Sequence, residues 1–414
     1  MNDALLVLED GTSFRGRGFG ATGTVLGEAV FNTGMAGYQE VLSDPSYHRQ
    51  IVTMTAPHVG NYGMNAHDME SDRIQVAGFV VKEAARRPSS WRSEQDLASA
   101  LQAAEVVGIE HIDTRRLTRH LRDRGAMRAG ISTEILDVDA LRDQVLASPT
   151  MEGAELVSAV TTPHAYVLEP AGSGAAPGGP AMSGRPAPAD DGAPASRAAT
   201  FGRTASSTTP RARIVAIDFG MKRSIGHHLT AAGAQVHVLP ASATPDEVRA
   251  LEPDGLFLSN GPGDPAMVEQ GTATTAALLG EVPVFGICLG SQLLGRAFGA
   301  DTYKLAFGHH GVNQPVLRRA DRAVEITSHN HGFAVRASSL GEPIDDHTFR
   351  TAEHGTVEVS HVNLNDDVVE GLTAHDLRAF SVQYHPEAAP GPSDARYLFE
   401  RFLSMLDRER GEGA

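Results

Sequence analysis

The sequence contains a single cysteine, Cys288, among 414 residues. No intrachain disulfide can form, and a lone thiol fits a reducing compartment. The N terminus lacks the basic start and the long apolar run of a signal peptide. No stretch approaches the roughly 20 apolar residues that a membrane-spanning helix needs. We therefore expect a cytoplasmic protein.

Basic residues are in the minority, with 35 Lys and Arg against 51 Asp and Glu, which gives a formal net charge of −16. An excess of negative charge disfavours binding to nucleic acids or to anionic membranes. The hydrophobic share of 41% and the charged share of 21% are typical of a globular protein. A chain of this length predicts two or three domains.

The sequence also lacks the phosphate-binding loop G-x-x-x-x-G-K-[ST]. Residues 18–23 do match the dinucleotide-binding pattern G-x-G-x-x-G, but Thr24-Val25-Leu26-Gly27 follows, with no convincing helix and no surrounding βαβ unit. We therefore expect no dinucleotide site there. Any ATP chemistry must then lie on another chain.

The clearest boundary along the chain is a change of composition. From about Pro170 to Pro210 the residues are nearly all Ala, Gly, Pro and Ser, which bury too little apolar surface to offset the entropy of ordering. We therefore predict an N-terminal domain over residues 1–165, a flexible linker over 166–211 and a C-terminal domain over 212–407.

The two domains differ in their hydrophobic patterns. In the first, short apolar runs precede helical periodicity, which predicts a mixed α+β domain. Its runs lie at residues 4–9, 28–32 and 50–56, and its helical patterns at 112–124 and 139–148. The second alternates strictly, which predicts an α/β domain with a parallel sheet covered by helices on both faces. Its expected strands are 213–218, 235–239, 255–259 and 282–287, and its expected helices are 222–232, 245–251, 267–279 and 393–408.

Cys288 lies in a G-x-C-x-G pattern that follows an apolar run and precedes a helix. This is the thiol counterpart of a nucleophile elbow, in which Gly286 and Gly290 permit a sharp turn from strand to helix. The N terminus of the following helix favours the thiolate anion. A lone cysteine is also commonly a small buried hydrophobic residue, so this pattern needs support from other residues.

A candidate base follows the last apolar run, in His385-Pro386-Glu387. A cysteine nucleophile needs an imidazole that keeps it ionised and later protonates the leaving amine. A carboxylate two residues further on can orient that imidazole. Taken alone, the same tripeptide is compatible with a turn histidine followed by a solvated glutamate.

Two polar turns complete the candidate site. Asn260-Gly261-Pro262-Gly263 follows an expected strand, and the backbone N–H groups of Gly261 and Leu289 could stabilise a tetrahedral oxyanion. The second turn holds His329 and His331 in an H-x-H spacing, and His309-His310 is a further pair. No Cys or carboxylate cluster accompanies either pair in the sequence, so we expect no metal site.

Together the three motifs around Cys288, His385 and Asn260 resemble class I, triad-type glutamine amidotransferases. The rest of the chain is similar to the small subunit of carbamoyl-phosphate synthase. Residues 5–12, 31–40 (F-N-T-G-M-A-G-Y-Q-E), 44–47 and 112–115 resemble its N-terminal domain, and residues 307–311 (F-G-H-H-G) resemble its amidotransferase domain. The chain departs from the pattern in its long Ala/Gly/Pro/Ser segment and in Ala306, where a basic residue is expected.

The resemblance implies a flavodoxin-like class I glutamine amidotransferase domain behind a smaller N-terminal β/β/α domain. It implies Cys288 as nucleophile, with His385 and Glu387 completing a triad. The residues that it implies for holding L-glutamine lie in both domains: Ser46, Gly261, Gly263, Leu289, Gln292, Asn330, Gly332 and Phe333.

The resemblance also implies a large-subunit partner, which receives ammonia through a tunnel. That partner would bind ATP and Mg²⁺ and make carbamoyl phosphate from bicarbonate for arginine and pyrimidine synthesis, with no cofactor on the present chain. Three alternatives remain: the amidotransferase subunit of another synthase such as anthranilate synthase, a catalytically silent subunit, and a free-standing cysteine hydrolase. The N-terminal domain argues against the first, and the intact triad argues against the second.

Overall fold

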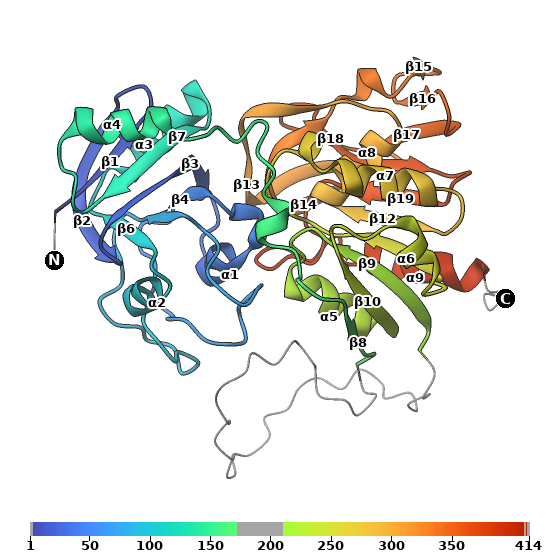
Figure 1. Ribbon diagram of the computed structural model, residues 1–414, viewed down its shortest axis with the longest axis horizontal. Helices are drawn as coiled ribbons and strands as arrows, with labels where there is room; N and C mark the ends of the chain where they lie inside the picture. The colour runs from blue at the N-terminus through green and yellow to red at the C-terminus, as the bar shows by residue number, and fades with distance from the viewer. Residues whose placement is uncertain (1–2, 172–209, 410, 412–414) are drawn as a thin grey trace, which may run out of the picture.

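A computed structural model describes residues 3–171, 210–409 and 411. It contains two bodies that lie side by side, with the N-terminal domain on the left of Figure 1 and the C-terminal domain on the right. The segment 172–209, which holds most of the predicted linker, is outside the described residues. Within the described parts, no helix is both long and apolar enough to span a membrane.

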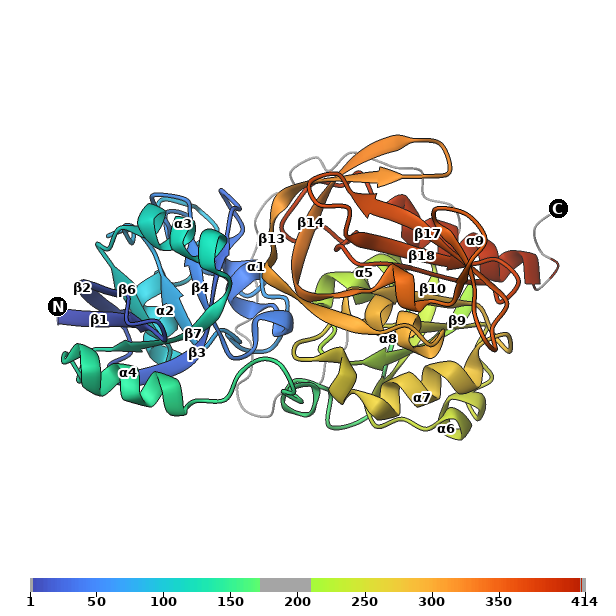
Figure 2. The ribbon, with the colours of Figure 1, turned by 90° about the horizontal axis from the view of Figure 1, so that it is seen from above.

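Seven strands of the N-terminal domain close into a barrel in the order β1-β2-β6-β5-β4-β3-β7. They are β1 (Asp3–Leu8), β2 (Ser13–Gly20), β3 (Thr24–Asn32), β4 (Gln50–Met54), β5 (Gly78–Val80), β6 (Val107–Glu110) and β7 (Met127–Ser132). Helices α2 (Leu97–Ala103), α3 (Thr114–Arg124) and α4 (Val138–Ala147) lie around it (Figure 2). The expected β/β/α domain therefore takes the form of one closed barrel with helices outside it.

Strand β1 shows why the strands of this barrel have continuous apolar sequences. Leu6 and Leu8 are buried in the barrel core, whereas Leu5 and Val7 point the other way and pack on Leu141 of α4. Successive side chains of a strand face opposite sides, so a strand covered on both sides is apolar throughout. Residues 18–23, which match the dinucleotide pattern, lie in β2 and the turn after it, and strand β3 follows them instead of a helix.

The C-terminal domain is built on a parallel sheet with the order β10-β9-β11-β12-β19. These strands are β9 (Ala212–Asp218), β10 (Ala234–Pro240), β11 (Gly255–Leu258), β12 (Val284–Ile287) and β19 (Ala379–Val382). In chain order this is 2-1-3-4-5, the flavodoxin-like arrangement. The expected flavodoxin-like fold is confirmed.

Helices cover both faces of this sheet. They are α5 (Arg223–Ala231), α6 (Pro245–Arg249), α7 (Glu269–Leu278), α8 (Leu289–Ala297) and α9 (Tyr397–Glu409). On one face Phe285 stacks on Phe380 with ring centroids 4.4 Å apart, and Phe402 of α9 lies against both rings. On the other face Leu256 and Leu258 belong to a separate buried cluster.

Antiparallel strands extend the sheet beyond β19, in the order β18 (Val369–Ala374), β17 (Thr356–Asn363), β13 (Thr302–Arg318) and β14 (Ala323–Val335). The hairpin of β13 and β14 runs along the side that faces the N-terminal domain (Figures 1 and 2). At the opposite edge, Tyr166–Leu168 form β8, which pairs antiparallel with β10. The structure thus places the start of the predicted linker in the C-terminal sheet.

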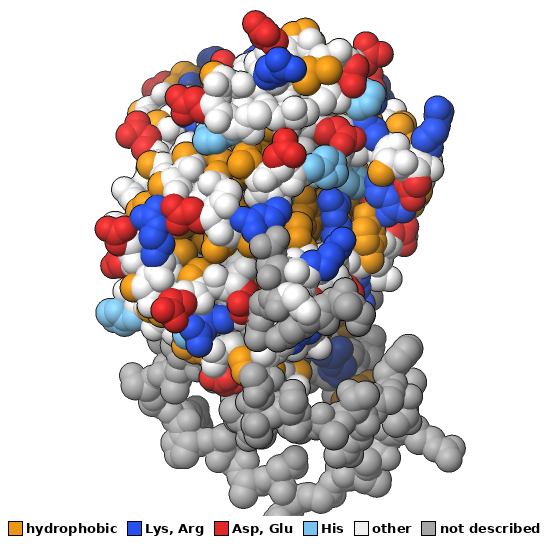
Figure 3. Space-filling view, turned by 90° about the vertical axis from the view of Figure 1, so that its right-hand side faces the viewer, with side chains coloured by type: hydrophobic (Ala, Val, Ile, Leu, Met, Phe, Trp, Pro, Cys, Tyr) orange, Lys and Arg blue, Asp and Glu red, His pale blue; other side chains and the backbone are white. Residues whose placement is uncertain are grey.

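The face drawn in Figure 3, which is the right-hand side of Figure 1, carries acidic and basic side chains interspersed with apolar ones. The net charge of −16 is therefore not gathered into one acidic field on this face.

Candidate active site

Cys288 occupies the turn between β12 and α8, with φ 55° and ψ −107°. A non-glycine residue at positive φ is strained, which is characteristic of a nucleophile elbow. The turn leaves no room for side chains on its glycines, because a Cβ on Gly290 would lie 2.2 Å from the carbonyl oxygen of Leu258. The thiol is buried, and its Sγ lies 3.6 Å from the carbonyl oxygen of Asn330.

His385 and Glu387 follow β19, the strand next to β12 in the sheet. The two strands are parallel, so their carboxyl ends meet at one edge and bring Cys288 and His385 together across 97 residues of sequence (385 − 288 = 97). Nδ1 of His385 lies 2.6 Å from Oε1 of Glu387, and both side chains are buried. The carboxylate therefore orients the ring and leaves Nε2 for other partners.

The electrostatics of this group favour a charged imidazole. Burial alone would lower the pKa of His385, but the charges of Glu387 and Cys288 and hydrogen bonds to both outweigh it and raise the pKa to about 10. An imidazolium beside a sulfur atom stabilises the thiolate form of that sulfur. The arrangement is suited to nucleophilic attack by Cys288.

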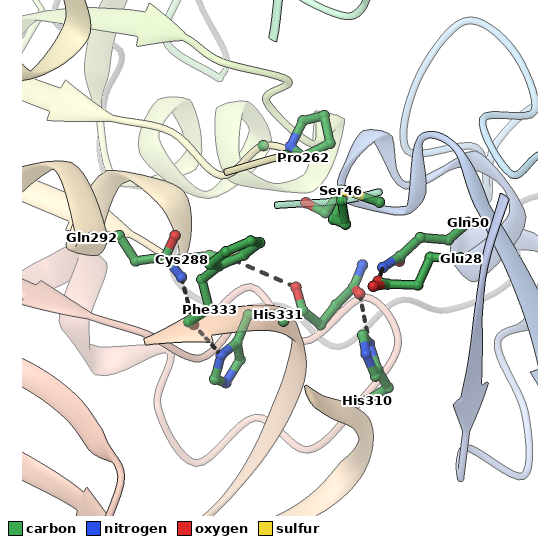
Figure 4. A pocket seen from close by; sticks show the side chains of 14 residues that line it. Glu28, Ser46, Gln50, Pro262, Cys288, Gln292, His310, His331 and Phe333 are labelled. Carbon is green, nitrogen blue, oxygen red and sulfur yellow. Dashed lines mark hydrogen bonds between the residues drawn. The ribbon is translucent and has the colours of Figure 1, made fainter. Parts of the chain in front are cut away.

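A pocket that is partly open to solvent has Cys288 in its lining (Figure 4). Residues of both domains line it, with Glu28 and Gln50 on one side and Cys288 and Gln292 on the other. The full lining is Glu28, Ser46, Gln50, Met151, Gly261, Pro262, Gly263, Cys288, Gln292, His310, Asn330, His331, Gly332 and Phe333.

Hydrogen bonds and an ion pair join the two domains at this pocket. Asn260 Nδ2 donates to Ser46 Oγ over 2.9 Å, and Asn330 Nδ2 donates to Asp44 Oδ2 over 2.9 Å. Lys304 Nζ of β13 lies 2.7 Å from Glu28 Oε1 of β3. The pocket is therefore a feature of the domain interface.

Comparison with known proteins agrees with this architecture. Residues 6–131 match the model of the carbamoyl-phosphate synthase small chain, CPSase domain, and residues 215–405 match that of class I glutamine amidotransferases. The carbamoyl phosphate synthase small chain of Streptomyces coelicolor is 50% identical over 98% of this chain and 97% of its own. Those of Streptomyces avermitilis and a Synechococcus species are each 49% identical over 98% of this chain, and over 97% and 94% of their own lengths. The chain belongs to the carbamoyl phosphate synthase small chain family.

The residues that the sequence predicted for a glutamine pocket of this family come together in the structure. All of them except Leu289 line the pocket described above. Leu289 directly follows Cys288 as the first residue of α8 and is buried. A Cβ on Gly261 would lie 2.2 Å from the carbonyl oxygen of Phe219, so this position accepts only glycine without rearrangement.

Sequence reasoning missed Lys222, which is buried beside the His385–Glu387 pair. Its Nζ lies 2.9 Å from Glu387 Oε1 and donates to the carbonyl oxygen of Ala389 over 2.6 Å. Burial alone would lower the pKa of Lys222, but nearby carboxylates, Glu387 foremost, outweigh it and raise it. Burial alone would raise the pKa of Glu387, but Lys222 and His385 outweigh it and hold that pKa far below its usual range. Lys222 thus keeps the carboxylate of Glu387 ionised. No motif in the sequence around Lys222 indicates this role.

Of the N-terminal residues that line the pocket, the sequence predicted only Ser46, and it did not predict Glu28, Gln50 or Met151. Gln50 Nε2 donates to Glu28 Oε2 over 3.0 Å, and Met151 packs with Phe333 in a small apolar cluster. These positions belong to ordinary-looking strands and turns, so only the domain packing reveals them. His310 also lines the pocket, and burial lowers its pKa to about 3, which keeps it neutral.

Proposed function

We propose that this chain hydrolyses L-glutamine at Cys288 and supplies the ammonia to a carbamoyl-phosphate synthase large subunit. The observation that carries the proposal is the pocket at the domain interface, which has Cys288 in its lining beside the buried His385–Glu387 pair. The family membership supports the same function.

In the first step, the thiolate of Cys288 attacks the side-chain amide carbon of glutamine and forms a carbon–sulfur bond. The backbone N–H groups of Gly261 and Leu289 stabilise the resulting oxyanion. His385 then gives its proton to the amide nitrogen, the carbon–nitrogen bond breaks, and ammonia leaves. The enzyme is left as a glutamyl thioester.

In the second step, water attacks the thioester while His385 accepts a proton from it. The carbon–sulfur bond breaks, glutamate leaves and the thiolate is restored beside the imidazolium. The sum is glutamine and water to glutamate and ammonia, so no cofactor is required on this chain. Glu387, which is paired with Lys222, holds the ring of His385 in one orientation through both steps.

The steps that convert ammonia to carbamoyl phosphate would take place on the partner. The large subunit would bind ATP and Mg²⁺ and use bicarbonate and the delivered ammonia to make carbamoyl phosphate, for arginine and pyrimidine synthesis in the cytoplasm. The sequence of the present chain, which lacks a G-x-x-x-x-G-K-[ST] loop, is compatible with this division.

The decisive experiment mixes the purified chain with the large subunit from the same cell and measures carbamoyl phosphate made from bicarbonate and ATP. Glutamine or an ammonium salt is the nitrogen source, and Cys288→Ser is assayed in parallel. We expect wild type to use both sources and the variant complex to use only ammonia. If wild type fails with glutamine but works with ammonia, the chain is either a silent subunit or the partner of a different synthase, and the proposal is wrong.

A further inference from the structure

Four buried side chains next to the pocket converge on one point of the C-terminal domain: His309 of β13, His329 and His331 of β14, and Glu370 of β18. One ligand atom from each lies within 4.8 Å of the others. Glu370 supplies the carboxylate that the H-x-H spacing lacks in the sequence, since it lies 39 residues after His331 (370 − 331 = 39).

The hydrogen bonds of His331 fix which of its nitrogens carries a proton. Nδ1 lies 2.9 Å from the carbonyl oxygen of Phe333, which can only accept, so Nδ1 is the donor. In the neutral ring, Nε2 therefore presents a lone pair. That lone pair faces Nδ1 of His329 across 3.1 Å.

His329 is fixed in the same way. Its Nε2 lies 2.8 Å from the hydroxyl oxygen of Thr327, whose own proton is donated to the carbonyl oxygen of Gln314 over 2.9 Å. The hydroxyl must then accept a hydrogen bond from Nε2 of His329. Nδ1 of the neutral ring is left with a lone pair, so two lone pairs meet between His329 and His331.

His309 and Glu370 add two further acceptors. Nε2 of His309 lies 2.8 Å from Asp366 Oδ2, and its Nδ1 lies 3.4 Å from Oε1 of Glu370, so a proton or a metal ion must lie between these two atoms. Oε1 of Glu370 accepts a hydrogen bond from Asn363 Nδ2 over 3.0 Å, while Oε2 has no hydrogen-bond partner in the described parts. Two facing lone pairs on His329 and His331, beside a carboxylate oxygen that has no donor, are unfavourable in a buried place unless a cation lies among them.

We propose that His309, His329, His331 and Glu370 bind a divalent first-row transition metal ion, with zinc as the favoured ion. Zinc is bound by imidazole nitrogens and carboxylate oxygens, and four protein ligands that leave no open position are characteristic of a structural site. The carboxylate of Asp366, the hydroxyl of Thr327 and the carbonyl of Phe333 hold the outer ring nitrogens, as partners of zinc-bound histidines do.

The spacing of the ligand atoms agrees with this assignment. Zinc–ligand bonds of about 2.0–2.1 Å in a tetrahedron place neighbouring ligand atoms about 3.3 Å apart. Three of the six separations are 3.1 Å between His329 Nδ1 and His331 Nε2, 3.4 Å between His309 Nδ1 and Glu370 Oε1, and 3.6 Å between His329 Nδ1 and Glu370 Oε1. All four ligand atoms lie within 4.8 Å of one another. A proton on His309 could supply the positive charge in place of zinc, and measuring the metal content of the protein distinguishes these two explanations.

The site would hold three strands of the antiparallel extension together next to the pocket. The carbonyl oxygen of Phe333 accepts hydrogen bonds from both His331 Nδ1 and Gln292 Nε2. Because His331 lines the pocket, tests of the metal site should leave it intact. His329 and Glu370 are the residues to change.

The experiment uses the untagged full-length chain, produced with zinc in the medium and dialysed without chelator. Metal content is measured by mass spectrometry for wild type, Glu370→Gln and His329→Gln. His361→Gln is the matched control, since His361 is equally buried in β17 but lies outside the cluster. Wild-type protein stripped with a chelator is also titrated with Co²⁺, whose four-coordinate complexes absorb strongly in visible light.

We expect one equivalent of zinc in wild type and in His361→Gln, and at least a tenfold loss of bound zinc in the two cluster variants. Cobalt should give the four-coordinate spectrum with wild type, and excess zinc should abolish it. Background zinc in wild type together with no cobalt spectrum would overturn the proposal, as would undiminished zinc in both cluster variants. If the variants do not fold, the wild-type zinc content and cobalt spectrum decide the question.

Discussion

The two domains contribute differently to the one pocket that they share. The C-terminal domain supplies every group proposed to react or to tune a reacting group, namely Cys288, His385, Glu387 and Lys222. The N-terminal barrel supplies polar groups such as Ser46 that face the thiol from across the interface.

This division follows from the geometry of the two folds. Parallel strands end at one edge, so β12 and β19 bring a nucleophile and a base together with little freedom of movement. The barrel reaches the pocket through the short 3-10 helix η1 (Pro45–Tyr47) and the strands β3 and β4. Substitutions of the four C-terminal groups named above should therefore act mainly on kcat, and those of the barrel residues that line the pocket mainly on KM.

The largest expected effect is that of His385→Asn. The ring is both the partner of the thiolate and the proposed proton donor to ammonia, so kcat for glutamine hydrolysis should fall by about 10³–10⁴. Glutamate release by the reconstituted complex measures it, and ammonia-dependent synthesis should be unchanged. His361→Asn, at a buried site outside the pocket, is the control. A kcat within a few-fold of wild type would remove His385 from the mechanism.

Lys222→Met should have the next largest effect. It leaves the buried carboxylate of Glu387 with His385 as its remaining charged partner, and breaking such a pair costs about 3–5 kcal/mol. We expect kcat to fall by about 10²-fold and the melting temperature to drop. Lys82→Met, at an exposed position of the barrel domain, should change neither.

The double variant Lys222→Met with Glu387→Gln sharpens this test. Neutralising both partners should recover part of the stability, because the carboxylate of Glu387 is no longer buried without its lysine, while activity stays low. If Lys222→Met alone keeps the wild-type kcat, then the lysine serves folding only, and positioning of the triad rests on Glu387.

The sequence predicts those parts of the site that depend on motifs or patterns of neighbouring residues. The glycines around Cys288 and the alternation of strands and helices predicted both the elbow and the sheet on which it lies, and the structure contains them. Strand adjacency then explains the meeting of Cys288 and His385. These features follow from backbone rules that act over a few residues.

Other parts had no local signal. Lys222 follows β9, and its role comes from burial beside Glu387, which lies 165 residues away in sequence (387 − 222 = 165). Glu370 reaches the histidine cluster through the pairing of antiparallel strands. The three residues of strand β8 are too few to show a period, so the sequence predicts them as part of the linker.

The pH dependence of activity tests the charged pair of His385 and Glu387. The pKa of His385 is raised to about 10, so the imidazolium persists at neutral pH and is lost as the pH rises through that value. Activity that needs the imidazolium should therefore decline only in that alkaline range. In Glu387→Gln the carboxylate charge is gone, so the alkaline limb of a kcat/KM profile should move to lower pH. An unmoved limb would show that another group sets it.

The smallest expected effect is that of Ser46→Ala, which tests whether the barrel contributes to glutamine binding. Ser46→Ala removes a hydroxyl that lines the pocket and accepts a hydrogen bond from Asn260. One lost hydrogen bond of about 0.5–1.5 kcal/mol corresponds to a rise in KM for glutamine of about 2–10-fold, with kcat near the wild-type value. Steady-state glutaminase kinetics of the complex measure both constants, and Ser158→Ala, at an exposed position, is the control. A group that only holds the substrate changes KM. If kcat falls while KM stays constant, then Ser46 acts on the transition state, and the barrel contributes to the chemistry as well as to binding.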